Sequence, residues 1–270
     1  MITSEDVVLR ASGARVVYNE GTGREVEAVR NISLNLQRGE ILALVGPSGC
    51  GKTTLFNAIA GLIPLQGGRV EVGGHQVDKA TGHVGYMLQK DLLLPWRSVI
   101  DNVTLGLEIR GMPKAQSRRI ALELIGRYGL AGFENSKPSG LSGGMRQRVA
   151  LMRTLAFDPD VILLDEPFSA LDFQTRLLLQ ADVTRIIKEQ QKSAILITHD
   201  IGEAISMADR IVVLTNRPAT VKVVHDVEFR TAETDAVNIR THPEYQRLFA
   251  QIWSELEIID ETTRVAAKVA

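Results

Sequence analysis

The chain has 270 residues, of which 44% are hydrophobic and 5% aromatic, and its formal net charge at pH 7 is -1. A chain of this length buries roughly 75% of its unfolded surface, which is enough for one core and a smaller appended subdomain. Nucleic-acid binders carry a basic excess or a clustered cationic face, whereas here basic and acidic residues are interleaved. We therefore expect no nucleic-acid partner.

The cysteine content and the apolar runs of the sequence restrict the cellular compartment and the membrane topology that we expect. The single cysteine, Cys50, excludes an intramolecular disulfide and a cysteine metal cluster, and fits a reducing compartment. The first ten residues contain early acidic side chains and no long apolar core, so we expect no signal peptide. No uninterrupted apolar stretch approaches the roughly 20 residues of a membrane-spanning helix. Any membrane role is expected to come through a partner.

The first part of the chain is rich in predicted strands. Residues 7–36 are typical of short strands separated by a turn at Gly21-Thr22-Gly23, and residues 32–36 alternate as a half-buried strand does. Residues 41–45 form a continuous apolar run, which predicts a parallel strand covered on both faces. A helix is expected over about residues 52–62.

A helical segment then interrupts the strands. A hairpin-like stretch at Gly73-Gly74 precedes a predicted strand at residues 83–87. From about residue 90 to 140 the periodicity is helical, with one helix predicted near 98–110. A second is expected to open with Pro113 and to run toward Tyr128. This pattern predicts an inserted helical subdomain.

Strand and helix patterns alternate again after the insert. Residues 161–164 and 194–198 predict buried strands, each followed by a helix, and residues 210–214 and 220–224 complete the sheet. Beyond Phe229 we expect a tail with one amphipathic helix at residues 243–256, which says nothing about chemistry. The fold class is therefore predicted to be α/β.

A phosphate-binding loop is predicted between the strand at residues 41–45 and the helix that follows. The loop fits the pattern G-x-x-x-x-G-K-[ST] with Gly46, Pro47, Ser48, Gly49, Cys50, Gly51, Lys52 and Thr53, and Thr54 adjoins it. Glycines let backbone N–H groups turn toward phosphate oxygens at the positive end of the helix. Lys52 is expected to neutralise the β- and γ-phosphates, and Thr53 to offer its hydroxyl to Mg²⁺. The alternative, a chance glycine-rich turn, is disfavoured by the flanking strand and helix. The loop predicts binding of magnesium-ATP.

Two carboxylates end the predicted strand at residues 161–164. Asp165 and Glu166 lie at the carboxyl edge of the sheet, where doubly wound folds bind ligands. Asp165 is suited to the metal shell, and Glu166 to orienting the water that attacks the γ-phosphate. The alternative is an acid pair that merely begins a turn. With the phosphate-binding loop present, the catalytic interpretation is favoured.

A second glycine-rich segment begins another helix. Ser142 is a good N-cap, and it is followed by Gly143 and Gly144, which weaken a first helical turn but leave its N–H groups bare. This segment, residues 141–148, resembles the signature of the ABC ATPase family. The resemblance implies that it closes over the γ-phosphate held by another subunit, so that the enzyme works as a head-to-tail dimer of two copies. Met145 stands where glutamine is frequent in the family.

The resemblance covers about residues 8–224, with the motifs in the family's order. It implies a P-loop NTPase (RecA-like) core with an N-terminal antiparallel β-subdomain and an inserted α-helical subdomain. The ATPase domain is then expected at residues 1–228, with its helical subdomain at about 90–140. Residues 229–270 form the expected C-terminal tail.

Further residues match the family's motifs. Gln89 matches the glutamine that senses metal and attacking water, and Asp172 closes a loop that crosses the dimer interface, although it fits an ordinary helix cap equally well. His199 matches the switch histidine on the γ-phosphate, which makes Lys52, Glu166 and His199 the expected catalytic residues. Tyr18 matches the aromatic residue that stacks on adenine, with strand packing as the alternative.

Two acidic residues next to His199 have a structural interpretation. Asp200 and Glu203 form a D-x-x-E capping pattern, which accounts for their charges without a catalytic role.

The segments at residues 89–96 and 170–175 are similar to those of importer ATPases for nitrate, sulfonates and taurine. Local packing is the alternative for the apolar residues at 92–96. The resemblance implies a cytoplasmic subunit, peripheral on the inner face of the membrane, that docks beneath permease subunits fed by an extracytoplasmic solute-binding protein. We expect uptake of a small anionic or sulfonate-like solute. The alternatives are an importer of an unrelated nutrient, a soluble non-transport ABC ATPase and a small-molecule kinase.

Overall fold

The computed structural model describes residues 6–19, 25–80, 82–229 and 238–269, with residues 257–269 described as backbone only. A first sheet in the described chain has the order β2-β1-β4-β5, and β1 pairs antiparallel with β2 and with β4. Its strands are β1 (Val7–Asn19), β2 (Glu25–Gln37), β4 (Gly67–Val72) and β5 (His75–Gln76). The β-rich first section and the hairpin are therefore confirmed, but β1 and β2 have 13 residues each and are not the short strands that were predicted. The predicted turn at Gly21-Thr22-Gly23 lies outside the described residues.

A second sheet carries the predicted buried strands, in the order β10-β9-β3-β8-β7-β6. Its strands are β3 (Ile41–Val45), β6 (Val84–Met87), β7 (Val161–Asp165), β8 (Ser193–Ile197), β9 (Arg210–Leu214) and β10 (Val221–Asp226). Neighbours from β9 to β6 pair in parallel, and β10 closes one edge antiparallel to β9. All residues of β3, β7 and β8 are buried.

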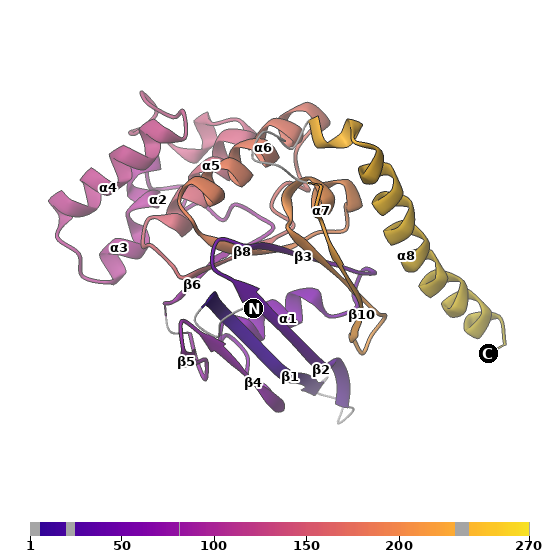
Figure 1. Ribbon diagram of the computed structural model, residues 1–270. Coiled ribbons are helices and arrows are strands. Elements are labelled where there is room, and N and C mark those ends of the chain that lie inside the picture. Colours follow the sequence, from indigo (N-terminus) through magenta and orange to yellow (C-terminus); the bar gives the residue numbers. More distant parts are fainter. Residues whose placement is uncertain (1–5, 20–24, 81, 230–237, 270) are drawn as a thin grey trace.

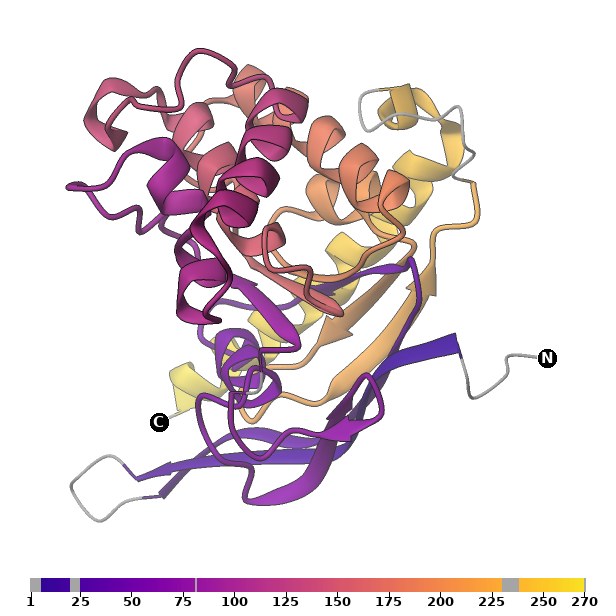
Figure 2. The same cartoon turned by 90° about the vertical axis from the view of Figure 1, so that its left-hand side faces the viewer.

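The second sheet lies between two cores, which explains its continuous apolar strands. Ile41 and Ala43 of β3 belong to the core beneath the helices, whereas Leu42 and Leu44 belong to the core shared with the first sheet. Successive side chains of a strand point to opposite faces, so a strand covered on both faces must be apolar at every position. Figures 1 and 2 show the helices on one side and the first sheet with α1 on the other.

The helices follow the predicted order with three differences in their bounds. They are α1 (Lys52–Ile59), α2 (Val99–Val103), α3 (Leu105–Ile109), α4 (Lys114–Arg127), α5 (Gly143–Leu155), α6 (Phe173–Glu189), α7 (Ile201–Met207) and α8 (Pro243–Val269), with 3-10 turns η2 (Pro138–Gly140) and η3 (Asn238–Thr241). The helix predicted near residues 98–110 is two short helices that meet at Thr104. Helix α1 ends at Ile59 because Gly61 adopts a φ of 70°. Helix α8 continues well beyond residue 256.

Helix α8 packs on the main body through one face. Tyr245, Leu248 and Ile252 of this helix are buried in the core beneath the helices, and the helix contacts α7 and β9. Across the part of the chain that the structure describes, no helix combines the length and the apolar character needed to span a lipid bilayer.

Candidate functional site

The phosphate-binding loop joins the end of β3 to the start of α1, as predicted. Gly49 and Gly51 have φ values of 73° and 127°, which side chains of L-residues rarely tolerate. A Cβ atom on Gly51 would also lie 2.6 Å from the carbonyl oxygen of Ala28 in β2. Glycine is therefore required at position 51 by backbone shape and by close approach of a neighbouring strand. The motif alone did not indicate the second reason.

The ammonium group of Lys52 lies across this loop. Its Nζ donates hydrogen bonds to the carbonyl oxygens of Gly46 at 2.8 Å and Pro47 at 3.0 Å, and only 7% of the residue is exposed. An ammonium has three N–H donors, so it can hold the loop and still approach a phosphate oxygen. The positive charge of Lys52 is thus already placed within the phosphate-binding loop before a nucleotide binds.

Thr53 and Asp165 lie together at the floor of the loop. The hydroxyl of Thr53 donates to Oδ1 of Asp165 at 3.4 Å, and the hydroxyl of Tyr86 donates to Oδ2 at 3.3 Å. Burial raises the pKa of Asp165 above its ordinary value, and these two hydroxyl contacts oppose the shift. Burial likewise raises the pKa of Tyr86, which keeps its hydroxyl a donor. Tyr86 was not among the predicted site residues, because only the pairing of β6 with β7 brings it to Asp165.

The oxygen atoms at this floor fit a magnesium ion. A threonine hydroxyl and one carboxylate are the hard donors that Mg²⁺ takes from P-loop proteins, with phosphate and water completing the shell. No group of three or more His, Cys, Asp or Glu side chains suited to a metal occurs among the described residues. The hydroxyl of Thr53 and the carboxylate of Asp165 are donors that fit a magnesium ion bound together with a nucleotide. Gln89, also predicted near the metal, contacts Glu166 and Ser169.

Glu166 is the centre of a polar cluster formed by three separate segments. Its Oε2 accepts a hydrogen bond from Nε2 of Gln89 at 3.0 Å, and its Oε1 lies 3.2 Å from Nδ1 of His199. The backbone of Glu166 has a φ of 45°, and its N–H donates to the carbonyl oxygen of Ile197 at 2.9 Å. A non-glycine residue at positive φ is uncommon and often marks a functional position. The predicted residues Gln89, Glu166 and His199 are thus brought together.

The glycines of the second segment lie against a different part of the chain. Ser142 caps α5 by accepting a hydrogen bond from the N–H of Met145 at 3.3 Å, as predicted. A Cβ on Gly144 would lie 2.9 Å from Cγ2 of Thr175. The N–H of Thr175 also donates at 3.0 Å to Asp172, which caps α6. The cap function of Asp172 is therefore confirmed, and this hydrogen bond lowers its pKa.

Tyr18 lies beside the start of α1. Its hydroxyl donates to Oγ1 of Thr54 at 3.1 Å, and 38% of the residue is exposed. The ring is therefore available next to the phosphate-binding loop, where an adenine ring could stack on it.

The capping prediction for Asp200 and Glu203 is half right. Asp200 does cap α7, because its Oδ1 accepts the N–H of Glu203 at 3.0 Å. The side chain of Glu203 does not return to the N-cap. Its Oε2 accepts a hydrogen bond from Thr198 at 3.1 Å, its Oε1 has no hydrogen-bond partner in the described structure, and 4% of the residue is exposed. Burial raises the pKa of Glu203 to about 8.

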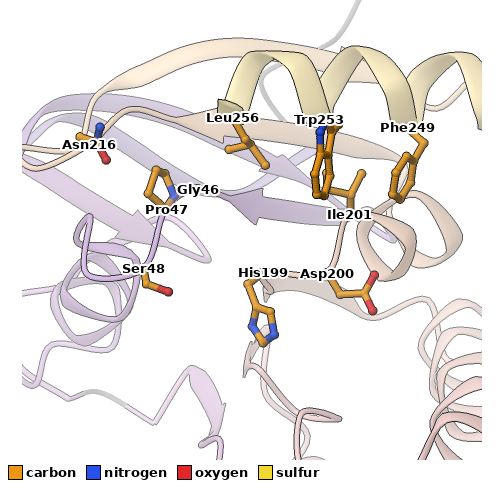
Figure 3. Close-up of a pocket in the computed structure, with 10 residues that line it drawn as sticks. All are labelled: Gly46, Pro47, Ser48, His199, Asp200, Ile201, Asn216, Phe249, Trp253 and Leu256. Atoms are coloured by element: carbon orange, nitrogen blue, oxygen red, sulfur yellow. The ribbon is translucent and has the colours of Figure 1, made fainter. Parts of the chain in front are cut away.

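A cavity of about 620 Å³ adjoins the phosphate-binding loop. Figure 3 shows Phe249, Trp253 and Leu256 pointing into it from α8, with Pro47 and His199 on other sides. The sequence of the C-terminal segment was uninformative about chemistry, and the structure places part of this segment beside the phosphate-binding loop. A periodic apolar face does not reveal in sequence which other segment it will meet.

A phosphate-binding loop on a parallel strand, with acidic residues at the end of another strand of the same sheet, defines a P-loop nucleotide-binding protein. The family model described as ABC transporter matches residues 29–169. The chain belongs to the ABC transporter ATP-binding family, and it is an ATPase whose activity is coupled to transport. The predicted fold class is thereby confirmed.

Several named proteins are similar to this chain. An uncharacterized ABC transporter ATP-binding protein, YtlC of Bacillus subtilis, is 47% identical over 237 residues, covering 88% of this chain and 91% of that protein. The taurine import ATP-binding protein TauB of Rhizobium johnstonii is 41% identical over 263 residues, covering 96% of this chain and 100% of that protein. TauB of Escherichia coli is 45% identical over 194 residues, covering 72% of this chain and 76% of that protein.

Solved structures show the same fold. The chain resembles the ABC transporter cassette MJ0796 with a TM-score of 0.70 at 29% identity, over 81% of this chain and 98% of that one. The descriptions of two such structures call them dimeric, and one of these is a post-hydrolysis state bound to ADP and Pi.

Proposed function

We propose that this chain is the ATP-hydrolysing motor subunit of an importer, and that it hydrolyses magnesium-ATP at an interface between two copies. The observation that carries the proposal is the cluster in which Gln89 and His199 both contact Glu166, at the same sheet edge as Lys52 and Thr53. In this proposal residues 1–228 form the ATPase domain, with the helical subdomain at about 90–140, and residues 229–270 are its tail.

The chemistry follows from the charges and donors of the site. Bound Mg²⁺ supplies charge neutralisation at the β- and γ-phosphates. Thr53 and Asp165 would hold this ion, while Lys52 and the bare N–H groups of the loop would hold the phosphate oxygens. Glu166 accepts a proton from the attacking water, and Gln89 and His199 fix the direction of its carboxylate. Tyr18 stacks on adenine.

A second copy completes the site. Ser142, Gly143 and Gly144 begin α5 with N–H groups free of bulky side chains, yet they do not line the cavity beside Pro47 and Ser48 in their own subunit. A head-to-tail pair places this helix start over the γ-phosphate in the other copy's loop. The dimeric relatives support this arrangement.

The membrane partner is a permease, reached through the segment after Gln89. Leu92 and Trp96 are exposed by 52% and 70%, whereas Leu93 is buried, so packing explains only part of this apolar segment. Arg153 of α5 donates to the carbonyl oxygens of Asp91 at 2.6 Å and Leu92 at 2.8 Å. The segment is therefore tied to the helix that begins with the second glycine pair. Movement of that helix on ATP binding would be transmitted to the exposed apolar residues.

The imported solute is small and either anionic or sulfonate-like. Support comes from the relatives named as taurine import proteins. The chain would then be cytoplasmic, peripheral on the inner face of the membrane, and served indirectly by an extracytoplasmic solute-binding protein.

The test has two stages. Phosphate release from MgATP without any acceptor separates an ATPase from a phosphotransferase, and we expect release that requires Mg²⁺. The tagged chain is then purified from solubilised membranes of its own host and the co-purifying permease is identified. Uptake of a labelled sulfonate is compared in cells with and without the chain. Absence of any co-purifying permease would contradict the transport role, and unchanged sulfonate uptake would contradict the solute.

A further inference from the structure

Helix α8 carries a row of aromatic side chains that leads from the core to the surface. The rings of Tyr245 and Phe249 lie 6.3 Å apart at 25°, and those of Phe249 and Trp253 lie 6.3 Å apart at 12°. Tyr245 is buried, whereas 51% of Trp253 is exposed. The buried end anchors the row, and the exposed end leaves a large apolar surface in solvent.

This exposed end forms one wall of the cavity beside the phosphate-binding loop, which we call the α8 cleft. Phe249, Trp253 and Leu256 line it on the α8 side, and Ser48 and His199 line it on the nucleotide side (Figure 3). Large exposed aromatic surfaces in a concave site mark interaction sites more often than accidental exposure. The cleft therefore opens where the second copy is proposed to approach.

A matching exposed aromatic residue lies beside the second glycine pair. Phe173, the first residue of α6, is 64% exposed. A Cβ on Gly143 would lie 3.4 Å from the side chain of Leu171, and one on Gly144 would lie 2.9 Å from that of Thr175. The start of α5 and the start of α6 are thus packed together. A surface that receives Gly143 would therefore lie close to the start of α6, where Phe173 is exposed.

We propose that the α8 cleft receives Phe173 of a second copy, so that Trp253 is part of the ATP-dependent dimer interface. This inference rests on the proposed head-to-tail dimer. In that arrangement the partner's Gly143 faces the loop that holds Ser48, and the partner's Phe173 is carried to the rim of the same loop. Two apolar surfaces that are separately exposed to water would then cover each other. Helix α8 would thereby sense the closed, ATP-bound state.

The first test follows dimer formation directly. In the Glu166→Gln background, MgATP is expected to produce a dimer, which light scattering measures against protein concentration. Phe173→Ser and Trp253→Ala are each expected to weaken dimerisation about 10- to 100-fold, as loss of a buried aromatic anchor does. Leu178→Ser is the matched control, because Leu178 lies on the same helix and is also 64% exposed. The double variant should lose less than the product of the two single effects, because both remove one contact.

The second test uses tryptophan emission. The chain has two tryptophans, so Trp96→Phe leaves Trp253 as the only emitter. On addition of MgATP we expect its emission to move to shorter wavelength and its quenching by acrylamide to fall, and Phe173→Ser should abolish both changes.

The two proposals fail in different ways. A dimer that forms with unchanged affinity in Phe173→Ser, while Trp253 stays accessible to quencher, overturns the inference and leaves the ATPase dimer intact. Absence of any MgATP-dependent dimer overturns both. Urea unfolding of each variant checks that these exposed substitutions leave the fold unchanged.

Discussion

The imidazole of His199 and the carboxylate of Glu166 lie 3.2 Å apart, although they follow two different strands of the second sheet. β7 and β8 pair in parallel, with Asp165 opposite Ile197, so the residues just after them emerge at the same edge. The carboxylate is thereby held between a ring nitrogen and the amide of Gln89. A carboxylate held in this way can orient one water molecule and accept its proton while its own orientation stays fixed.

Glu166→Gln is expected to lower ATP turnover by at least about 100-fold while nucleotide binding persists, because the amide keeps the shape but cannot accept a proton. Phosphate release measures turnover, and calorimetry measures binding. Glu189→Gln, which removes an exposed carboxylate on α6, is the control and should keep normal turnover. Normal turnover in Glu166→Gln would remove this residue from the proposed role.

Lys52→Ala is expected to weaken MgATP binding about 10- to 100-fold, because hydrogen bonds to charged groups contribute about 1.5 to 3 kcal/mol. The variant also loses the two hydrogen bonds that Lys52 donates to the loop. Calorimetry with the exposed Lys90→Ala as control measures the change. An unchanged dissociation constant for MgATP would contradict the assignment of residues 46–53 as the phosphate-binding loop.

Gly51→Ala is expected to lower the free energy of unfolding by about 3 kcal/mol or more, because it combines backbone strain with a clash against Ala28. Gly49→Ala provides the control, since Gly49 also has a positive φ but has open space around it. Its loss should be about 1 to 2 kcal/mol from backbone strain alone. Urea unfolding compares them. Equal losses of unfolding free energy in the two variants would show that the clash with Ala28 of β2 adds nothing to the backbone strain at position 51.

Local pattern was sufficient for the fold and for much of the candidate site. The apolar run at residues 41–45 and the loop after it are defined by short-range sequence, and the parallel sheet places Asp165 and Glu166 at the same edge. Helix bounds were less predictable, because Thr104 divides one expected helix and Gly61 ends another.

Contacts between distant segments were beyond local pattern. Tyr86 reaches Asp165 only through strand pairing, and the cleft under Trp253 exists only because α8 returns to the phosphate-binding loop. The buried carboxyl of Glu203 was also missed, because a D-x-x-E sequence does not say which way the glutamate points.

That buried carboxyl makes stability depend on pH. The folded chain holds the pKa of Glu203 at about 8, above its ordinary value of 4.5, so between these values the folded state binds one more proton than the unfolded state. Stability from this group is therefore complete below about pH 4.5 and is lost as pH rises toward 8, by roughly 1.4 kcal/mol per pH unit at most. Thr198, Asp200, Arg176 and Glu166 are the groups that act on Glu203.

Glu203→Gln is expected to remove this dependence, because an amide is neutral at every pH. Relative to the wild type, the variant should gain stability steadily from pH 5 to pH 8, and urea unfolding at several pH values measures the difference. Glu189→Gln again serves as control. The carboxylate of Glu189 is exposed, so its removal should leave the change of unfolding free energy with pH the same as in the wild type. A constant difference between Glu203→Gln and wild type across this range would mean that Glu203 is ionised in the folded chain. The charge would then have to be stabilised by Arg176, whose positive charge acts to lower the pKa of Glu203, and Arg176→Gln would restore the pH dependence.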